Sequence, residues 1–171
     1  MDMGMLTTID LRFEPLLLVG SSGEIATAVA GWLTSGLAVR VVRGRKMRSR
    51  GGLFDEFAAA FQYPLHFGEN MDAFDECIAE LEGVSAGEGF VVVIVEPEQV
   101  LVEDAAAVFN WLTQSLAAAA EKWALPVALG EWWDRDAVPF HIVLACDSEH
   151  SDAVANRWSA VGCRPIGVGD L

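Results

Sequence analysis

Long hydrophobic runs are absent from this 171-residue sequence. Its longest uninterrupted apolar stretch is Phe90–Val95, far shorter than the roughly 20 residues that a membrane-spanning helix requires. The first residues also lack a basic segment followed by an apolar block, which is the pattern of a secretory signal. These two absences predict a cytoplasmic protein without a membrane partner.

Cysteine is also scarce, with three residues in the chain, Cys77, Cys146 and Cys163. An odd number without a visible signal favours reduced thiols over a disulfide framework. Cys146 and His150 have a spacing seen in metal sites, but no second close pair completes a set of ligands. We therefore expect neither a metal site nor another cofactor.

Motifs of the common enzyme classes are missing as well. The sequence contains no Gly-x-Ser-x-Gly turn, no His-Glu-x-x-His pair and no phosphate-binding loop with a lysine. Asp72 and Glu76 are the remaining candidates for a general acid and base, but no metal ligand accompanies them. The sequence therefore predicts a protein that is not an enzyme.

Positively charged residues are also few. The chain has 11 Lys and Arg against 25 Asp and Glu, a formal net charge of −14. An acidic chain repels nucleic acid and attracts cationic partners, although the same charge also keeps ordinary proteins in solution. Six of the cations crowd into one segment, at Arg40, Arg43, Arg45, Lys46, Arg48 and Arg50. Because no aromatic residues alternate with them, we expect this segment to be solvated or paired with nearby acids.

What the sequence does contain is an alternation of short apolar segments with longer helical ones. Strands are predicted at Leu16–Val19, Leu37–Val42, Phe90–Val95 and Phe140–Ala145, with a possible edge strand at Cys163–Val168. Helices are predicted from Ser21 to about Leu33, for about three turns after Gly52, from about Asn70 to Glu82, from about Glu103 to Trp123, and around Ser151–Val161. This order predicts one α/β domain over residues 1–171, with a mainly parallel sheet of three core strands plus possible edge strands, flanked by helices.

Two interpretations fit the loop from Gly20 to Gly23. Ser21, followed three residues later by Glu24, matches a capping box that opens a helix. The loop could instead hold a phosphate at the helix N-terminus. It lacks the lysine of a P-loop and the third glycine of a dinucleotide fingerprint, so we expect a turn and a cap.

The segment from Glu69 to Leu81 separates into two faces when it is placed on a helix. Its apolar residues gather on one arc, which comprises Met71, Phe74, Cys77, Ile78 and Leu81. Glu69, Asp72, Glu76 and Glu80 fall within about 80° of one another, nearly opposite that arc, and Asp75 lies off to one side. Like charges four residues apart destabilise a helix by about 0.2–0.5 kcal/mol per pair. The row therefore indicates either an ordinary solvated face or a surface for a basic partner.

The run from Pro64 to Ile78 carries a further signal, because it contains Phe67-Gly68-Glu69-Asn70-Met71-Asp72-Ala73-Phe74 followed by Cys77-Ile78. It resembles the hallmark of the barstar family, an aromatic–Gly–Glu/Asn–hydrophobic–Asp–Ala segment that enters the second helix. The order of the surrounding elements agrees from about Leu37 to Ala145. The resemblance implies a core at residues 37–145, with a strand–helix extension at 1–36 and another extension at 146–171.

Barstar-like proteins are small α/β inhibitors of basic microbial ribonucleases, and their helix carboxylates take the place of substrate phosphates. The resemblance therefore implies a bacterial immunity protein whose partner is a basic ribonuclease or nuclease toxin. It implies partner contacts at His66, Phe67, Gly68, Glu69, Asn70, Asp72, Asp75, Glu76 and Glu80. Glu76 stands where the family has its principal aspartate, while Asp75 and Leu81 stand where it has tryptophans. His66 matches a contact aromatic, although a solvated or capping histidine is the alternative, and Phe67 is expected to pack mainly in the core.

A second function is compatible with the same fold. The protein could be a non-inhibitory interaction or regulatory module that binds another basic protein, or nucleic acid through the Arg40–Arg50 segment; nucleic acid is not the expected partner. Trp132 and Trp133 lie outside the resemblance and are expected to pack in the core or at a sheet edge, with an exposed hot spot as the alternative. Glu131, Asp134 and Asp136 fall near a region that supplies a further acidic contact in the family. The sequence indicates no oligomeric state.

Overall fold

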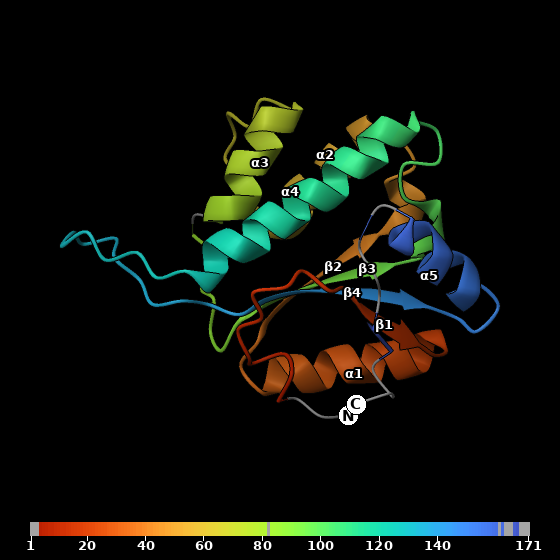
Figure 1. Ribbon diagram of the computed structural model, residues 1–171, viewed down its shortest axis with the longest axis horizontal. Coiled ribbons are helices and arrows are strands. Elements are labelled where there is room, and N and C mark those ends of the chain that lie inside the picture. The colour runs from red at the N-terminus through yellow and green to blue at the C-terminus, as the bar shows by residue number, and fades with distance from the viewer. Residues whose placement is uncertain (1–3, 82, 161, 163–165, 168–171) are drawn as a thin grey trace.

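Five strands form one sheet in the computed structural model (Figure 1), which describes residues 4–81, 83–160, 162 and 166–167. The strands are β1 (Leu16–Val19), β2 (Ala38–Arg43), β3 (Phe90–Val95), β4 (Phe140–Cys146) and β5 (Ile166–Gly167). Their order across the sheet is β2-β3-β4-β1-β5, and each of these neighbouring pairs is parallel. The predicted α/β class with a mainly parallel sheet is confirmed.

The helices are divided unequally between the two faces of the sheet (Figure 1). One face is covered by α2 (Arg50–Phe61), α3 (Met71–Glu80), α4 (Ala106–Ala124) and α5 (Ser151–Ser159). The opposite face is covered by α1 (Ser22–Thr34), which belongs to the strand–helix unit that precedes β2. The sheet is therefore buried on both sides, as parallel sheets usually are.

The apolar side chains of β3 pack on both faces of the sheet. Val92 and Ile94 join the core under α2, α3 and α4, whereas Val91 and Val93 pack against the layer that includes Trp32 of α1. All four of these strand residues are fully buried. Because successive side chains of a strand point to opposite faces, a strand covered on both sides has no polar position, and this explains the uninterrupted run that the sequence shows.

Several predicted element ends differ from those in the structure. Helix α3 ends at Glu80 instead of Glu82, because Leu81 adopts a left-handed conformation with φ of 43° and its N–H donates to the Cys77 carbonyl. Helix α4 begins at Ala106, since turns occupy the residues before it. Of the predicted edge strand Cys163–Val168, the structure describes Ile166–Gly167, which pairs with β1. The other residues of that prediction, and Val161, lie outside the described residues.

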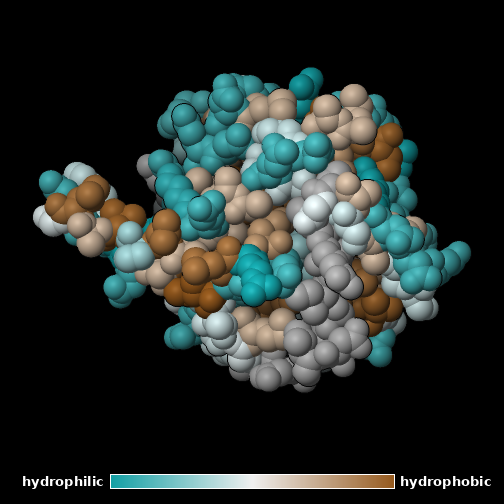
Figure 2. Space-filling model, viewed as in Figure 1, coloured by the Kyte–Doolittle hydropathy of each residue, from teal (hydrophilic) through white to brown (hydrophobic). Residues whose placement is uncertain are grey.

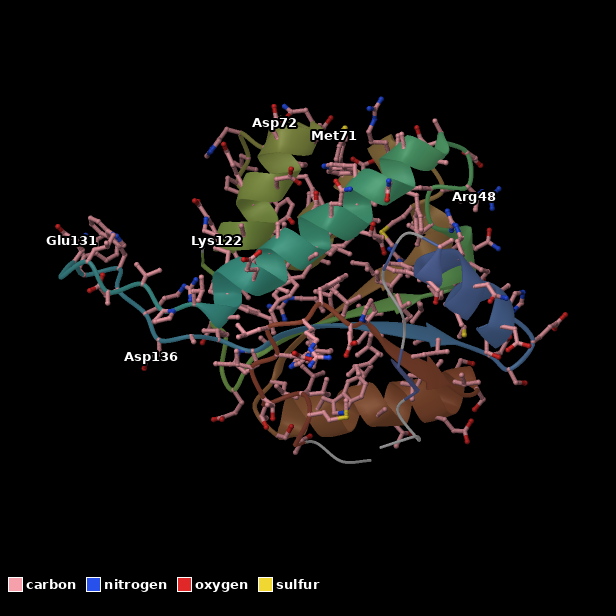
Figure 3. The ribbon with its side chains drawn as sticks, viewed as in Figure 1. Arg48, Met71, Asp72, Lys122, Glu131 and Asp136 are labelled. Carbon is pink, nitrogen blue, oxygen red and sulfur yellow. The ribbon has the colours of Figure 1, made fainter. Side chains whose placement is uncertain are left out.

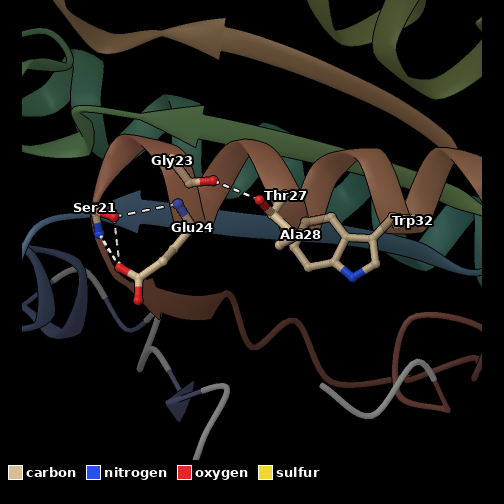
Figure 4. Close-up of a pocket in the computed structure, with 7 residues that line it drawn as sticks. Ser21, Gly23, Glu24, Thr27, Ala28 and Trp32 are labelled. Carbon is tan, nitrogen blue, oxygen red and sulfur yellow. Dashed lines mark hydrogen bonds between the residues drawn. The ribbon is translucent and has the colours of Figure 1, made fainter.

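The loop that follows β1 is a turn and a cap, as expected. The Glu24 carboxylate accepts hydrogen bonds from the Ser21 backbone N–H at 2.8 Å and from the Ser21 hydroxyl at 2.7 Å. The Ser21 hydroxyl oxygen in turn accepts the Glu24 N–H (Figure 4). A carboxylate of the chain therefore already lies at the N-terminus of α1, where a phosphate would have to bind.

Candidate partner-binding site

The loop that leads into α3 is held in one tight conformation. The Asn70 side chain accepts a hydrogen bond from the Ala73 N–H at 2.9 Å and donates one to the Gly68 carbonyl at 3.1 Å. It is thus the N-cap of α3, as residues of its type commonly are. Glu69 lies in the left-handed region with φ of 48°. A Cβ on Gly68 would stand 2.8 Å from the side-chain nitrogen of Asn70, so a larger residue at this position would displace the capping side chain.

Aromatic packing holds α3 against the body of the protein. Phe74 has no exposed surface, and its ring lies 5.0 Å from Phe57 and 5.3 Å from Trp111, in edge-on contacts. Phe67, from the preceding loop, packs edge-on against Phe54 and Tyr63 at 5.9 and 5.1 Å. The expectation that Phe67 packs mainly in the core is confirmed, and Phe74, which belongs to the predicted apolar arc, is buried there as well. Interlocking rings of this kind restrict sliding and rotation of the helix.

The acids of α3 form an exposed row on the side that faces away from this packing. Asp72, Glu76 and Glu80 are all exposed, as is Glu69 in the loop. Glu80 lies 3.7 Å from the Lys122 ammonium of α4, in an ion pair that is open to solvent on both sides. Asp72 and Glu76 have no ion pair with any described residue. The helical spacing predicted this face correctly, and three of its four carboxylates, those of Glu69, Asp72 and Glu76, have no ion pair with a described residue.

Asp75 is placed differently from the other acids. Its carboxylate accepts a hydrogen bond from the Ser115 hydroxyl and another from the Trp111 indole N–H at 3.5 Å, both on α4. The side chain is half-buried between the two helices. Asp75 therefore fixes the rotation of α3 on α4, a role that the sequence did not indicate, and its contact with a partner remains a prediction.

A small pocket of about 110 Å³ opens between the loop and the C-terminal half of α3. Its lining includes the predicted site residues His66, Glu76 and Glu80 together with Tyr63 and Leu81. His66 is exposed at the mouth, so the loop presents its imidazole to solvent. Burial raises the pKa of the Tyr63 phenol, and its hydroxyl has no hydrogen-bond partner among the described residues. Two acids of the row, Glu76 and Glu80, therefore line this pocket together with the apolar side chain of Leu81.

Three of the six cations of the basic segment near β2 are paired with acids from other parts of the chain. Arg43 makes a two-pronged ion pair with Glu56 of α2, with N–O distances of 2.6 and 2.9 Å. Arg45 and Arg48 pair with Glu96 and Glu103, at 2.9 and 2.8 Å. The Arg43 guanidinium holds the pKa of the Glu56 carboxyl below its usual range. The prediction of a segment paired with nearby acids is confirmed, and this pairing argues against a nucleic-acid surface.

The two tryptophans outside the resemblance are not in the core. Trp132 is 90% exposed and Trp133 is 51% exposed. They lie on a segment that projects from the body of the protein beyond the end of α4 (Figure 1). The expectation of core or sheet-edge packing was therefore wrong, because the chain between α4 and β4 extends away from the sheet before it enters β4.

Other sequence features do not form sites. Cys146 is buried, which raises the pKa of its thiol to about 11, and His150 is engaged with Asp147 at 2.8 Å. The described residues contain no group of three or more His, Cys, Asp or Glu side chains placed to hold a metal ion. Across the same residues, no helix is both long enough and apolar enough to cross a membrane.

Comparison with known proteins gives one family. A sequence model of the barstar family, described as barstar (barnase inhibitor), matches residues 37–145. A search of curated proteins found no match. The matched region spans β2 to β4 and includes the loop, α3 and the row of acids, and it covers more than half of the chain. The family is one of inhibitors, in agreement with the prediction that the protein is not an enzyme. This chain belongs to the barstar family.

Proposed function

We propose that this protein inhibits a basic ribonuclease by covering its active site with α3 and the loop at residues 66–70. The observation that carries the proposal is the row of exposed carboxylates at Asp72, Glu76 and Glu80, on a helix whose other side is fixed by aromatic packing. Ribonucleases gather Arg, Lys and His around the phosphates of RNA. Carboxylates at a matching spacing form short, charge-assisted hydrogen bonds with such groups, and opposite charge accelerates the encounter.

The remaining residues of the site have complementary roles. Glu76 has one methylene more than the aspartate usual in the family, so its carboxylate reaches further from the helix and suits a deeper or wider cationic site. His66 offers a flat ring beside the small pocket. Gly68, Glu69 and Asn70 bring the backbone of the loop close to the partner surface. Phe67 and Asp75 act mainly by holding these groups in place.

Inhibition of this kind suits an immunity protein. A bacterium that produces a ribonuclease toxin has to block any toxin molecule that remains in its cytoplasm, and to do so quickly. The net charge of −14 raises the rate at which a cationic enzyme meets the inhibitor. Fixed positions for the acids lower the entropy lost on binding, because the helix does not have to order itself on the enzyme.

The proposal is tested by titrating RNA cleavage by small basic ribonucleases. Barnase and any ribonuclease encoded beside this gene are incubated with increasing inhibitor at low salt, and residual activity is measured. We expect stoichiometric inhibition of at least one of these enzymes. The Asp72→Ala/Glu76→Ala variant should weaken inhibition at least about 1,000-fold, since loss of a charge from a hydrogen-bonded pair at an interface costs about 2–5 kcal/mol.

A matched control separates the site from net charge. The Glu149→Ala/Asp152→Ala variant removes the same two charges from exposed positions at α5. It should inhibit like the unmodified protein apart from a small decrease in association rate. If no enzyme of the panel is inhibited, or if both double variants are weakened equally, the proposal is overturned.

A further inference from the structure

The segment between α4 and β4 forms a projecting arm, defined here as residues 125–138. Val127 and Arg135 pair in an antiparallel bridge, with N–H to carbonyl distances of 2.8 and 3.0 Å in the two directions. The seven residues between them extend outward from the body of the protein (Figure 1). The arm is thus a loop that is closed at its base by one bridge and extends away from the sheet.

The tip of the arm is held by a single carboxylate. Asp134 accepts hydrogen bonds from the Leu129 N–H at 2.9 Å and the Gly130 N–H at 2.7 Å, while its own N–H donates to the Glu131 carbonyl at 3.1 Å. These backbone bonds lower the pKa of the Asp134 carboxyl, the bond from Leu129 most of all. Gly130 has φ of 81°, which favours glycine at the turn. The tip is therefore ordered without help from the rest of the protein.

The root of the arm is fixed to the end of α4. The Arg135 guanidinium lies 4.3 Å from the centre of the buried Trp123 ring and donates to the carbonyls of Lys122 and Leu125, each at 3.0 Å. The Val138 N–H donates to the Trp123 carbonyl at 2.8 Å. An arginine that stacks on an aromatic ring and also binds carbonyls at its edge has little freedom left. The direction of the arm is set by these contacts.

This fixed arm displays large apolar side chains in water. Trp132 and Trp133 lie with ring centres 5.3 Å apart at an angle of 85°, and Leu129 is also exposed. Figure 2 shows apolar residues along the projecting segment, away from the body of the protein. Tryptophan is among the residues most enriched at binding hot spots. A rigid support that exposes two of them is typical of an interaction surface and not of a solvated loop.

The arm also continues the acidic site. The Lys122 ammonium contacts Glu80 at the end of α3, and the carbonyl of the same residue accepts a hydrogen bond from Arg135. Figure 3 shows Lys122 near the start of the arm and Glu131 on the arm itself. The arm carries three acids, Glu131, Asp134 and Asp136, and a single cation, Arg135, whose guanidinium is turned inward onto Trp123. Its charge therefore has the same sign as that of the α3 row.

We propose that the arm is a second contact region for the basic ribonuclease, with Trp132 and Trp133 packing on the stems and cationic heads of Arg or Lys side chains beside the enzyme's active site. This inference rests on the proposed function, since it assigns a second surface to the same partner. Indole rings attract cations over their faces, and the flanking acids favour the same side chains. A second copy of this chain is a poor occupant, because it would bring another acidic surface against the acids of the arm.

The test compares variants of the two regions against the ribonuclease that the protein inhibits, with barnase as the first probe. Binding rates are measured by stopped-flow at two salt concentrations. The Trp132→Ser/Trp133→Ser variant should dissociate about 30-fold faster or more, the range expected for hot-spot residues, with an unchanged dependence of association on salt. The Asp72→Ala/Glu76→Ala variant should lose part of that salt dependence. A Leu11→Ser/Leu33→Ser control, which removes exposed apolar side chains elsewhere, should bind normally.

Each other outcome has a defined meaning. Normal binding by the tryptophan variant, together with weakened binding by the α3 variant, would overturn the arm proposal and leave the inhibitor function intact. Failure of the unmodified protein to bind any ribonuclease would overturn both. If sedimentation shows that the unmodified protein self-associates and the tryptophan variant does not, while inhibition by the two is equal, the arm binds a second copy and the proposal is wrong.

Discussion

The basic segment at Arg40–Arg50 and the acidic row on α3 are the two most charged regions of the molecule, and they use their charges in opposite ways. Three of the arginines form ion pairs with acids brought from other parts of the chain. Asp72 and Glu76 have no such partner among the described residues, and Glu80 has a solvent-exposed one. Charge that is compensated within the fold contributes to stability, whereas charge that is left uncompensated costs stability and is available to a partner.

The largest effect is expected from breaking the pair that is most buried in the basic segment. Glu56→Ala removes two ionic hydrogen bonds from Arg43 and a third from its backbone N–H. We expect a loss of about 2–3 kcal/mol in the free energy of unfolding, less than for a fully buried pair because half of the Arg43 side chain is exposed. Urea denaturation at neutral pH measures it, and a loss below about 0.5 kcal/mol would contradict the role of this pair.

The same pair predicts a pH dependence. The pKa of Glu56 is lowered in the folded protein from its ordinary value of 4.5, chiefly by the side-chain hydrogen bonds from Arg43. Its contribution is therefore complete above pH 4.5 and is lost as the pH falls through the lower, folded-state pKa. The difference in stability between the unmodified protein and Glu56→Ala should shrink on acidification below pH 4.5. A difference that grows on acidification would contradict this sign.

A smaller effect is expected for the acid of α3 that is used inside the fold. Asp75→Ala leaves the buried Ser115 hydroxyl and the Trp111 indole N–H without their acceptor. The expected loss is about 1–2 kcal/mol of unfolding free energy. Asp75→Asn, which keeps an acceptor oxygen, should recover much of it. Equal losses in the two variants would show that the charge of Asp75, and not its hydrogen bonding, matters.

The smallest effect is expected at the exposed row, with the opposite sign. Glu76→Gln removes the repulsion of Glu76 with Asp72 and with Glu80, both four residues away. It should raise the unfolding free energy by about 0.4–1 kcal/mol, the sum of two such pairs, while ribonuclease inhibition is weakened. Thermal denaturation at low salt gives the sign, and the gain should shrink at high salt. A destabilised variant would mean that the row contributes to the fold and is not reserved for a partner.

The sequence alone predicted most of the fold because its elements are strongly patterned. The continuous run of β3, the capping box at Ser21 and the two faces of α3 each follow from local periodicity, and the structure has all three. Asp75 was assigned to the partner surface because the barstar resemblance places it where the family has a tryptophan, and neither that resemblance nor a helical projection identifies the helix that packs beside it. Its partners lie on α4, about 40 residues further along the chain.

The arm was mispredicted for a related reason. Trp132 and Trp133 have the composition of a core segment, and local hydrophobicity does not show whether a chain returns directly to the sheet. The chain does not return directly to the sheet, because the Arg135 guanidinium binds at the end of α4 and the Asp134 carboxylate closes the turn at the tip of the arm. These contacts join a few polar groups across short distances, and no periodic pattern in the sequence predicts them. The acids of the site, by contrast, recur with the period of a helix, so the sequence predicted that they share one face.

The covering of the sheet on its second face has a practical consequence for anyone who shortens this protein. The family match begins at residue 37, but Val39, Val91, Val93 and Val143 pack against a layer supplied by earlier residues, including Leu16, Leu18 and Trp32. A chain trimmed to residues 37–145 would expose this apolar sheet to water and leave the β4 edge open to other molecules. Such a fragment is expected to aggregate on expression. The region matched by the family model is therefore shorter than the region that has to be expressed to obtain a protein that does not aggregate.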